Sequence, residues 1–247
     1  MIVTLLTDFG TVDGYVGEMK GVLATGAPHA SLIDVSHDLP PHDVECARLA
    51  VARYWRRFPE GTVHLVVIDP GVGSARACIA VESMGRFLVG PDNGALSPAL
   101  LIAGARAVVL DPPAGASATF HGRDVFAPAA AALAGGTPLD ALGQPHDAPV
   151  VRRTPEPHRL ADGGIAGEVI AVDRFGNAIT NLMTARAGGA VEAAGRSLPF
   201  VRTYADLDRG AAAALVGSSG LIEIAVREGS AAQALGLARG MMVVLRR

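Results

Sequence analysis

Short apolar runs alternate with segments of helical periodicity along the first part of the chain. Apolar runs without alternating polar positions are typical of strands that helices cover on both faces of a sheet. The expected strands cover residues 2–6, 31–35, 63–68, 78–82, 87–89 and 107–110, and the expected helices cover about 13–25, 44–57, 96–103 and 124–134. This order predicts an α/β domain whose central sheet is mostly parallel.

The composition of the chain changes between about residue 142 and residue 163, where prolines occur among polar residues. Such a stretch is typical of a linker. We therefore expect an N-terminal domain over residues 1–148, a linker over 149–163 and a C-terminal domain over 164–247. Beyond the linker, strands are expected at 167–173, 178–182, 198–202, 221–226 and 241–245, with short helices at 211–215 and 231–235. Strands between glycine-rich turns predict a small β-barrel or sandwich.

Composition narrows the class of protein. Half of the 247 residues are hydrophobic and 18% are charged, which is ample apolar material for a buried core. The net charge of −3 gives no basic face, so a nucleic-acid partner is not expected. No run approaches the ~18–20 apolar residues of a membrane span, so no membrane partner is expected either. Cys46 and Cys78 lack CxxC spacing and read as buried free thiols, which favours a cytoplasmic protein.

Acidic residues lie at or just beyond the carboxyl ends of three of the expected strands, namely Asp8, Asp34 and Asp69. Each alone is typical of a turn or a helix cap. Because ligand groups gather at the carboxyl ends of strands in open α/β sheets, the three together predict a polar crevice along one sheet edge. Two His-Asp pairs at 37–38 and 42–43 are a weak metal pattern, since prolines separate them and no helical His pair occurs. We expect no metal site.

The segment from Asp69 to Arg76 is the sharpest local feature. Gly71 and Gly73 allow the backbone to approach a ligand closely, although the segment lacks the third glycine of a dinucleotide fingerprint. A tight hairpin turn is the alternative interpretation. Asp69 directly follows a strongly apolar run, where a charge is costly unless it is paired. Arg76 returns on the next strand and is the expected partner.

A second concentration of functional groups lies at residues 119–124. Phe120 is suited to stack on a planar ring, and His121 is suited to handle a proton or polarise water. The alternative is a helix start capped by Asp124, with His121 on the surface.

Two turns of the C-terminal part carry ligand-type groups. Asp173 is suited to receive an ammonium group and Asn177 to contact a base edge or a hydroxyl. The turn with Ser218 and Ser219 offers backbone N–H and hydroxyl groups for a carboxylate. Ordinary β-turns are the alternative at both places.

Taken in order, these motifs resemble those of the SAM hydroxide adenosyltransferase family, the adenosine-forming S-adenosyl-L-methionine (SAM) hydrolases related to the fluorinase and chlorinase. The resemblance is colinear over nearly the whole chain. The matching motifs are Thr7–Gly10, Tyr15–Gly17, Met19–Gly21, Asp34–His37, Asp69–Gly73, Gly90–Gly94, Thr119–Asp124, Asp173–Asn177 and Ser218–Ala225.

The resemblance implies an α/β N-terminal domain, a C-terminal all-β barrel domain, and a homotrimer with active sites at subunit interfaces. SAM is the implied substrate, with no metal or organic cofactor. Implied roles are ribose binding by Asp8, adenine contact by Asn177, ammonium binding by Asp173, carboxylate binding by Ser218 and Ser219, and packing of Phe120 beside the reacting carbon. Further substrate contacts are implied for Tyr15, Val72 and Gly122.

Asp69, Arg76 and His121 match the catalytic, water-activating triad of the hydrolases. Members of the superfamily that use halide lack the Asp and the His, so their presence here favours water as the nucleophile. The sequence therefore predicts hydrolysis of SAM to adenosine and methionine by attack at the ribose 5′ carbon. A halide-dependent adenosyltransferase and a non-catalytic SAM- or adenosine-binding protein are the alternatives.

Overall fold

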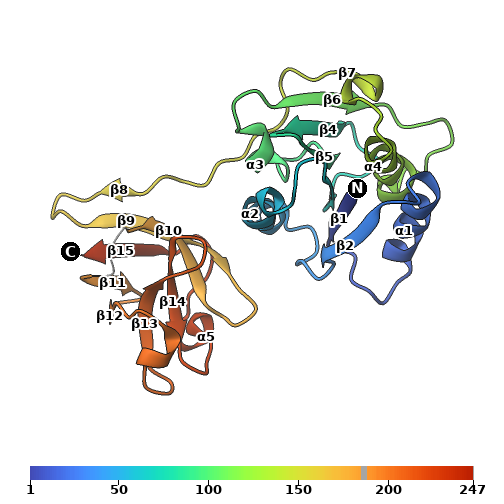
Figure 1. Ribbon diagram of the computed structural model, residues 1–247. Helices are drawn as coiled ribbons and strands as arrows, with labels where there is room; N and C mark the ends of the chain where they lie inside the picture. The colour runs from blue at the N-terminus through green and yellow to red at the C-terminus, as the bar shows by residue number, and fades with distance from the viewer. Residues whose placement is uncertain (185–187, 247) are drawn as a thin grey trace. The chain divides into compact units, whose positions relative to one another are not determined.

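A computed structural model describes residues 1–184 and 188–246 (Figure 1). Residues 185–187 and 247, which belong to the expected C-terminal domain, lie outside the described residues. The chain divides into two compact units, unit 1 over Met1–Arg152 and unit 2 over Arg153–Arg247. The expected linker at 149–163 straddles this division and contains the short strand β8.

Unit 1 is built around a seven-stranded sheet with the order β2-β1-β3-β5-β4-β6-β7. The pairings of β1 with β2, β1 with β3, and β3 with β5 are parallel, whereas those of β4 with β5, β4 with β6, and β6 with β7 are antiparallel. The strand bounds are β1 Ile2–Thr7, β2 Ser31–Ser36, β3 Val63–Val67, β4 Cys78–Ser83, β5 Arg86–Pro91, β6 Arg106–Leu110 and β7 Gly143–Pro145. The α/β class is confirmed, but the expectation of a mostly parallel sheet is wrong for half of the pairings.

The reason for the mixed sheet lies in the connection between β4 and β5. Only Met84 and Gly85 separate the two strands, and both have positive φ angles, of 49° and 67°. Parallel neighbours need a crossover of a dozen or more residues, whereas a two-residue turn with positive φ joins antiparallel strands. The short spacing between the two apolar runs was therefore a hairpin signal.

Helices cover both faces of this sheet. α1 (Tyr15–Gly26) and α4 (Ala127–Ala134) pack on one face in a core cluster with β1 and β3. α2 (Val44–Tyr54) and the single-turn α3 (Ser97–Leu100) pack on the other face, as Figure 1 shows. Because both faces are covered, β3 is buried along its whole length, and its carboxyl end opens into the loop that carries Asp69.

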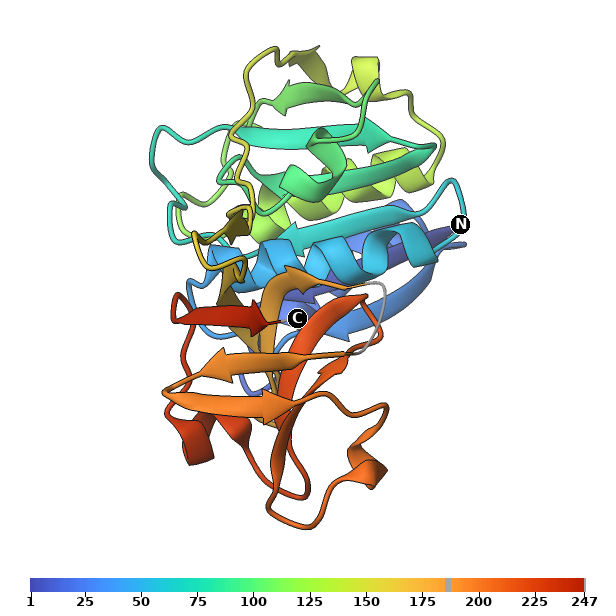
Figure 2. The ribbon, with the colours of Figure 1, turned by 90° about the vertical axis from the view of Figure 1, so that its left-hand side faces the viewer.

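Unit 2 is an antiparallel sheet with the order β12-β11-β15-β9-β10-β14-β13, and β8 pairs with β9 (Figure 2). A bridge between Phe200, just after β12, and Ala214 in β13 nearly closes it into a barrel. The strand bounds are β8 His158–Arg159, β9 Ile165–Val172, β10 Ala178–Met183, β11 Ala190–Ala193, β12 Arg196–Pro199, β13 Ala212–Val216, β14 Leu221–Val226 and β15 Met242–Arg246. The all-β, barrel-like architecture is confirmed.

The two short helices expected in unit 2 had different outcomes. α5 spans Ala231–Leu235, as expected, and Ser230 caps it by accepting from the Gln233 N–H at 3.1 Å. The other expected helix is strand β13, which pairs with β14 along its whole length. Alanine favours helix only weakly, so pairing with a neighbouring strand overrides that preference here.

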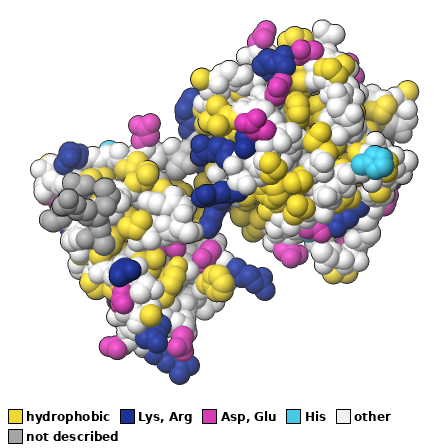
Figure 3. All heavy atoms as spheres, viewed as in Figure 1, with side chains coloured by type: hydrophobic (Ala, Val, Ile, Leu, Met, Phe, Trp, Pro, Cys, Tyr) yellow, Lys and Arg dark blue, Asp and Glu magenta, His cyan; other side chains and the backbone are white. Residues whose placement is uncertain are grey.

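Acidic and basic side chains both occur on each unit over the face seen in Figure 3, so neither unit presents a face of a single sign in this view. None of the helices within 1–184 and 188–246 is long and apolar enough to cross a membrane.

Burial of His64 in β3 predicts acid-sensitive stability. The side chain is fully buried, with Nδ1 2.8 Å from the Thr4 hydroxyl, and burial, helped by the charge of Arg86, lowers the pKa of His64 to about 4. In the unfolded chain His64 takes a proton as the pH falls through about 6.5, whereas the folded chain resists until about pH 4, so stability is lost across this window. Between pH 7 and pH 5 we expect His64 to lower the free energy of unfolding by about 2 kcal/mol.

Urea unfolding followed by the fluorescence of Trp55, the only tryptophan, measures this loss. His64→Gln should flatten the pH dependence by that amount, and His29→Gln, at an exposed position, should leave it unchanged. Parallel pH curves for the wild type and His64→Gln would contradict the assignment.

Candidate active site

The loop between β3 and β4 folds back so that Arg76 meets Asp69. The Asp69 carbonyl accepts the Val72 N–H at 3.3 Å, and the Gly71 carbonyl accepts the Ser74 N–H at 3.1 Å, which closes two successive turns. Arg76 donates two hydrogen bonds to Asp69, from Nε to Oδ1 at 2.8 Å and from Nη2 to Oδ2. The side chains are only 10% and 6% exposed, so the ion pair is shielded from water. The expected partnership is confirmed.

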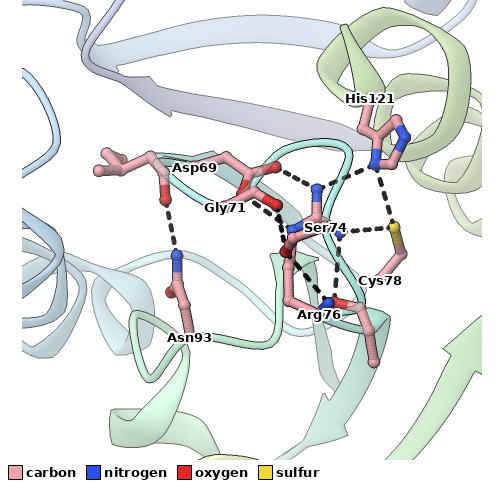
Figure 4. A network of polar contacts seen from close by, with 9 residues as sticks. Asp69, Gly71, Ser74, Arg76, Cys78, Asn93 and His121 are labelled. Carbon is pink, nitrogen blue, oxygen red and sulfur yellow. Dashed lines mark hydrogen bonds and ion pairs between the residues drawn. The ribbon is translucent and has the colours of Figure 1, made fainter. Parts of the chain in front are cut away.

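The motif at residues 90–94 is hydrogen-bonded to the start of this loop. Asn93 Nδ2 donates to the carbonyl of Ile68 at 2.8 Å (Figure 4). Asn93 Oδ1 accepts from the Ala95 N–H at 3.1 Å. The side chain of Asn93 therefore fixes the peptide that precedes Asp69.

Gly73 joins the same loop to the segment that carries His121. Its φ is +77°, and a Cβ atom there would lie 2.5 Å from the carbonyl oxygen of Ala118. The sequence predicted that Gly73 allows a close approach to a ligand; in the structure the close approach is to the backbone of Ala118. Any larger residue at this position separates the two loops.

His121 completes the cluster. It precedes the π-helical turn η2 (Gly122–Phe126), is 9% exposed, and its Nδ1 lies 2.9 Å from Arg76 Nη2. The ring of Phe126 supports both groups, with the Arg76 guanidinium carbon 5.3 Å from its centroid and His121 at an edge-to-face angle of 79°. Figure 4 shows Arg76 between Asp69 and His121. The structure therefore brings the three predicted catalytic residues together, and the surface interpretation of His121 is wrong.

Cys78 is a member of this cluster that sequence reasoning missed. Its Sγ lies 2.8 Å from Arg76 Nη1 and 3.6 Å from His121 Nδ1. Arg76 Nη1 also donates to the Ala77 carbonyl at 3.3 Å. With these contacts all five N–H groups of the guanidinium have partners. Burial raises the pKa of Cys78, so the group is a thiol near neutral pH. The only sequence signal was its position two residues after Arg76.

The protonation states follow from these contacts. Burial alone would lower the pKa of Arg76, but the hydrogen bonds and charge of Asp69 outweigh that effect and raise it. Burial and the charge of Arg76 lower the pKa of His121. Because Arg76 donates to Nδ1, this nitrogen carries the lone pair, and the proton of the neutral imidazole is on Nε2. Among the described contacts, Nε2 has no hydrogen-bond partner.

A cavity of about 360 Å³ lies over this cluster. Five of the predicted site residues besides Asp69 line it: Tyr15, Val72, Phe120, His121 and Gly122. It is also lined by residues to which the sequence assigned no role in the site. Among these, Phe9, Thr119 and Arg123 lie within the matching motifs, and Glu18 lies outside them.

The remaining acidic positions of the expected crevice have protein partners. Asp8 does not line the cavity; its Oδ2 accepts the backbone N–H of His42 at 2.7 Å. Asp34 pairs with Lys20 at 2.6 Å and with His37 Nε2 at 3.1 Å. The described residues contain no group of three or more His, Cys, Asp or Glu side chains arranged to hold a metal ion.

The four predicted ligand residues of unit 2 lie in turns. Asp173 accepts the N–H groups of Phe175 and Asn177, both at 2.9 Å, and the amide of Asn177 at 3.0 Å. Ser218 and Ser219 are exposed at the tip of the hairpin between β13 and β14. The turn geometry is present at both places, and the ligand roles stay predictions.

Comparisons with known proteins agree with the resemblance. Family models described as the SAM hydroxide adenosyltransferase N-terminal and C-terminal domains match residues 3–143 and 167–244. A protein of Thermus thermophilus named (R)-S-adenosyl-L-methionine hydrolase is 48% identical over 98% of both chains. A protein of the same name from Salinispora arenicola is 41% identical over 96% of this chain and 95% of its own. The crystal structure of an uncharacterized conserved protein from Thermotoga maritima, 32% identical, superimposes with a TM-score of 0.90 over the full length of both chains.

Proposed function

Since the chain belongs to the SAM hydroxide adenosyltransferase family, we propose that it hydrolyses SAM to adenosine and L-methionine. The observation that carries the proposal is the contact of Asp69, Arg76 and His121 at a cavity in unit 1. A carboxylate and an imidazole N–H beside one cavity are suited to hold a single water molecule. Placing that water in line with the C5′–S bond supplies much of the rate, because methionine is already a good leaving group on a sulfonium.

Each member of the triad has a distinct part in this mechanism. Asp69 accepts a hydrogen bond from the water and takes its proton, while the Nε2–H of His121 donates to the oxygen that attacks. The oxygen bonds to C5′, the C5′–S bond breaks, and its electron pair returns to sulfur to give the thioether of methionine. Arg76 donates to no water, since its N–H groups are engaged; it orients the other two groups and stabilises negative charge on the oxygen.

Product analysis in water enriched in heavy oxygen tests the proposal. We expect equal amounts of methionine and adenosine, with the label in the adenosine 5′-hydroxyl. Formation of 5′-chloro- or 5′-fluoro-5′-deoxyadenosine in the presence of halide would identify an adenosyltransferase instead. Tight nucleoside binding without release of methionine over hours would identify a binding protein.

The tautomer of His121 leads to a prediction that separates a hydrogen-bond donor from a base. His121→Gln keeps an N–H donor near the place of Nε2 but takes up no proton near neutral pH. His121→Ala should lose about 10²–10⁴-fold in rate, whereas His121→Gln should retain at least about tenfold more activity than His121→Ala. Equal loss in the two variants would assign His121 as the base.

The pH profile gives a second readout for His121. Its lowered pKa means that the neutral ring persists to more acid pH, so the acid limb of kcat/KM should lie below the ordinary histidine value of 6.5. Activity is lost as the pH falls through the lowered pKa, because a protonated Nδ1 cannot accept from Arg76. In His121→Gln this limb should be absent.

We extend the proposal to the rest of the substrate on the basis of the resemblance. The roles assigned there to Asp8, Phe120 and the four turn residues of unit 2 concern the ribose, the reacting carbon, the adenine and the methionine.

The chemistry needs no metal or organic cofactor, and dialysis against a chelator should leave the rate unchanged. No disulfide joins Cys46, which is half-buried rather than buried as expected, to the buried Cys78, and this supports a cytoplasmic enzyme.

We also propose a homotrimer in which unit 1 of one subunit and unit 2 of the next share a site. Mixing two inactive variants, Asp69→Asn and Asp173→Asn, and allowing subunits to exchange should restore about a quarter of the sites. Light scattering checks the subunit number, and adenosine release checks the restored activity. A mixture as inactive as its components, with exchange verified, would place both residues in the site of a single subunit.

A further inference from the structure

Three aromatic rings from separate segments meet at the cavity over the catalytic cluster. Phe9 follows β1, Tyr15 begins α1, and Phe120 precedes η2. Their ring centroids lie 5.2 to 5.9 Å apart in all three pairs, and the planes are inclined by 56°, 74° and 82°. All three rings line the cavity. Mutually inclined rings around one cavity have the geometry of an aromatic cage.

The charges around this cavity favour a cation. Arg123 is paired with Glu18 at 2.7 Å and with Asp124 at 2.7 Å and 2.9 Å, and Arg76 is paired with Asp69. His121 is neutral near pH 7, so these five charged groups leave one negative charge uncompensated. The guanidinium of Arg123 already lies 5.1 Å from the centroid of Phe120. One ring of the three therefore has a cation over its face in the protein alone.

We propose that Phe9, Tyr15 and Phe120 form a cage for the positive sulfur of SAM, and that this cage selects the sulfonium against the uncharged thioether. The inference rests on the proposed function and adds the group that recognises the charge. A sulfonium has no N–H or O–H group to donate, so hydrogen-bond acceptors cannot recognise it as they recognise an ammonium group that carries hydrogens. Aromatic faces and uncompensated carboxylate charge are the protein groups that attract such an ion.

The cage also bears on the end of the reaction. When the C5′–S bond breaks, sulfur becomes a neutral thioether and the attraction to the rings disappears. The cage therefore stabilises the substrate without holding the product to the same extent. A purely hydrophobic wall made of the same rings would bind sulfonium and thioether nucleosides without preference for charge.

Calorimetric binding of two probes that are not hydrolysed tests the cage. One is S-adenosyl-L-homocysteine, a neutral thioether; the other is a SAM analogue with a permanently charged quaternary ammonium in place of the sulfonium. The wild type should prefer the cation. Phe9→Leu and Tyr15→Leu should each reduce this preference about tenfold while changing thioether binding little. Tyr15→Phe, which keeps the ring, is the matched control and should retain the preference.

The outcomes separate the cage from the proposed hydrolysis. Equal weakening of both probes in the leucine variants, or no preference in the wild type, overturns the cage, whatever the protein does to SAM. Preferential binding of the cation by a protein that releases no adenosine keeps the cage and overturns the hydrolysis. Glu18→Gln provides a second measurement, because loss of this carboxylate should lower the preference for the cation more at low salt than at high salt.

Discussion

Replacing Arg76 with methionine is expected to slow hydrolysis by about 10²–10³-fold and to lower the free energy of unfolding by about 3–5 kcal/mol. The variant leaves the buried carboxylate of Asp69 without its partner and removes the donor that holds His121 Nδ1. Adenosine release measures the first effect, and urea unfolding followed by Trp55 fluorescence measures the second.

A double variant separates stability from catalysis. Asp69→Leu together with Arg76→Met replaces the buried ion pair by apolar side chains, which commonly restores stability. We expect the double variant to recover most of the stability lost in Arg76→Met but none of the activity. If Arg76→Met is as stable as the wild type, the ion pair does not stabilise the fold. If the double variant is active, the ion pair is not needed for catalysis.

Replacing Asp69 with asparagine is expected to lower kcat by about 10²–10⁴-fold. The amide has nearly the same shape, but it cannot take a proton from water, and its NH₂ group faces the donors of Arg76. The dissociation constant of SAM should rise far less than kcat falls, because the residues proposed to contact the substrate stay in place and only the attraction of the Asp69 charge for the sulfonium is lost.

Asp111→Asn is the matched control for this variant. Asp111 also follows a strand, β6, but it is exposed. The Asp111→Asn variant should retain wild-type activity. If kcat falls no more in Asp69→Asn than in the control, Asp69 does not take the proton from water, and another group must accept it.

The sequence predicted most elements of unit 1, because apolar runs and helical periodicity are local signals. It did not predict the direction of β4 and β5, although their two-residue separation carried that information. In unit 2 the alanine-rich residues of β13 resembled a helix, and only pairing with β14 decides their conformation. Such pairing depends on residues far along the chain, which periodicity does not register.

The catalytic cluster was predictable in part. An aspartate directly after a buried strand called for a partner, and Arg76 lay within reach in the sequence. The place of His121 rested on the family resemblance. The one signal for Cys78, its position two residues after Arg76, was too weak, because a buried cysteine at the start of a strand is ordinary packing unless its contact with the guanidinium is known. Phe9 and Glu18 come to the cavity only through the fold of β1 and α1.

The position of Asp69 has a consequence for which nucleophiles the cavity admits. A water molecule enters neutral, and when its proton passes to the carboxylate the total charge of the cavity stays the same. Chloride or fluoride would bring an additional negative charge beside an ionised carboxylate and has no proton to neutralise it. This protein should therefore exclude halide ions electrostatically, before the size of the ion or the strength of its bond to carbon has any effect.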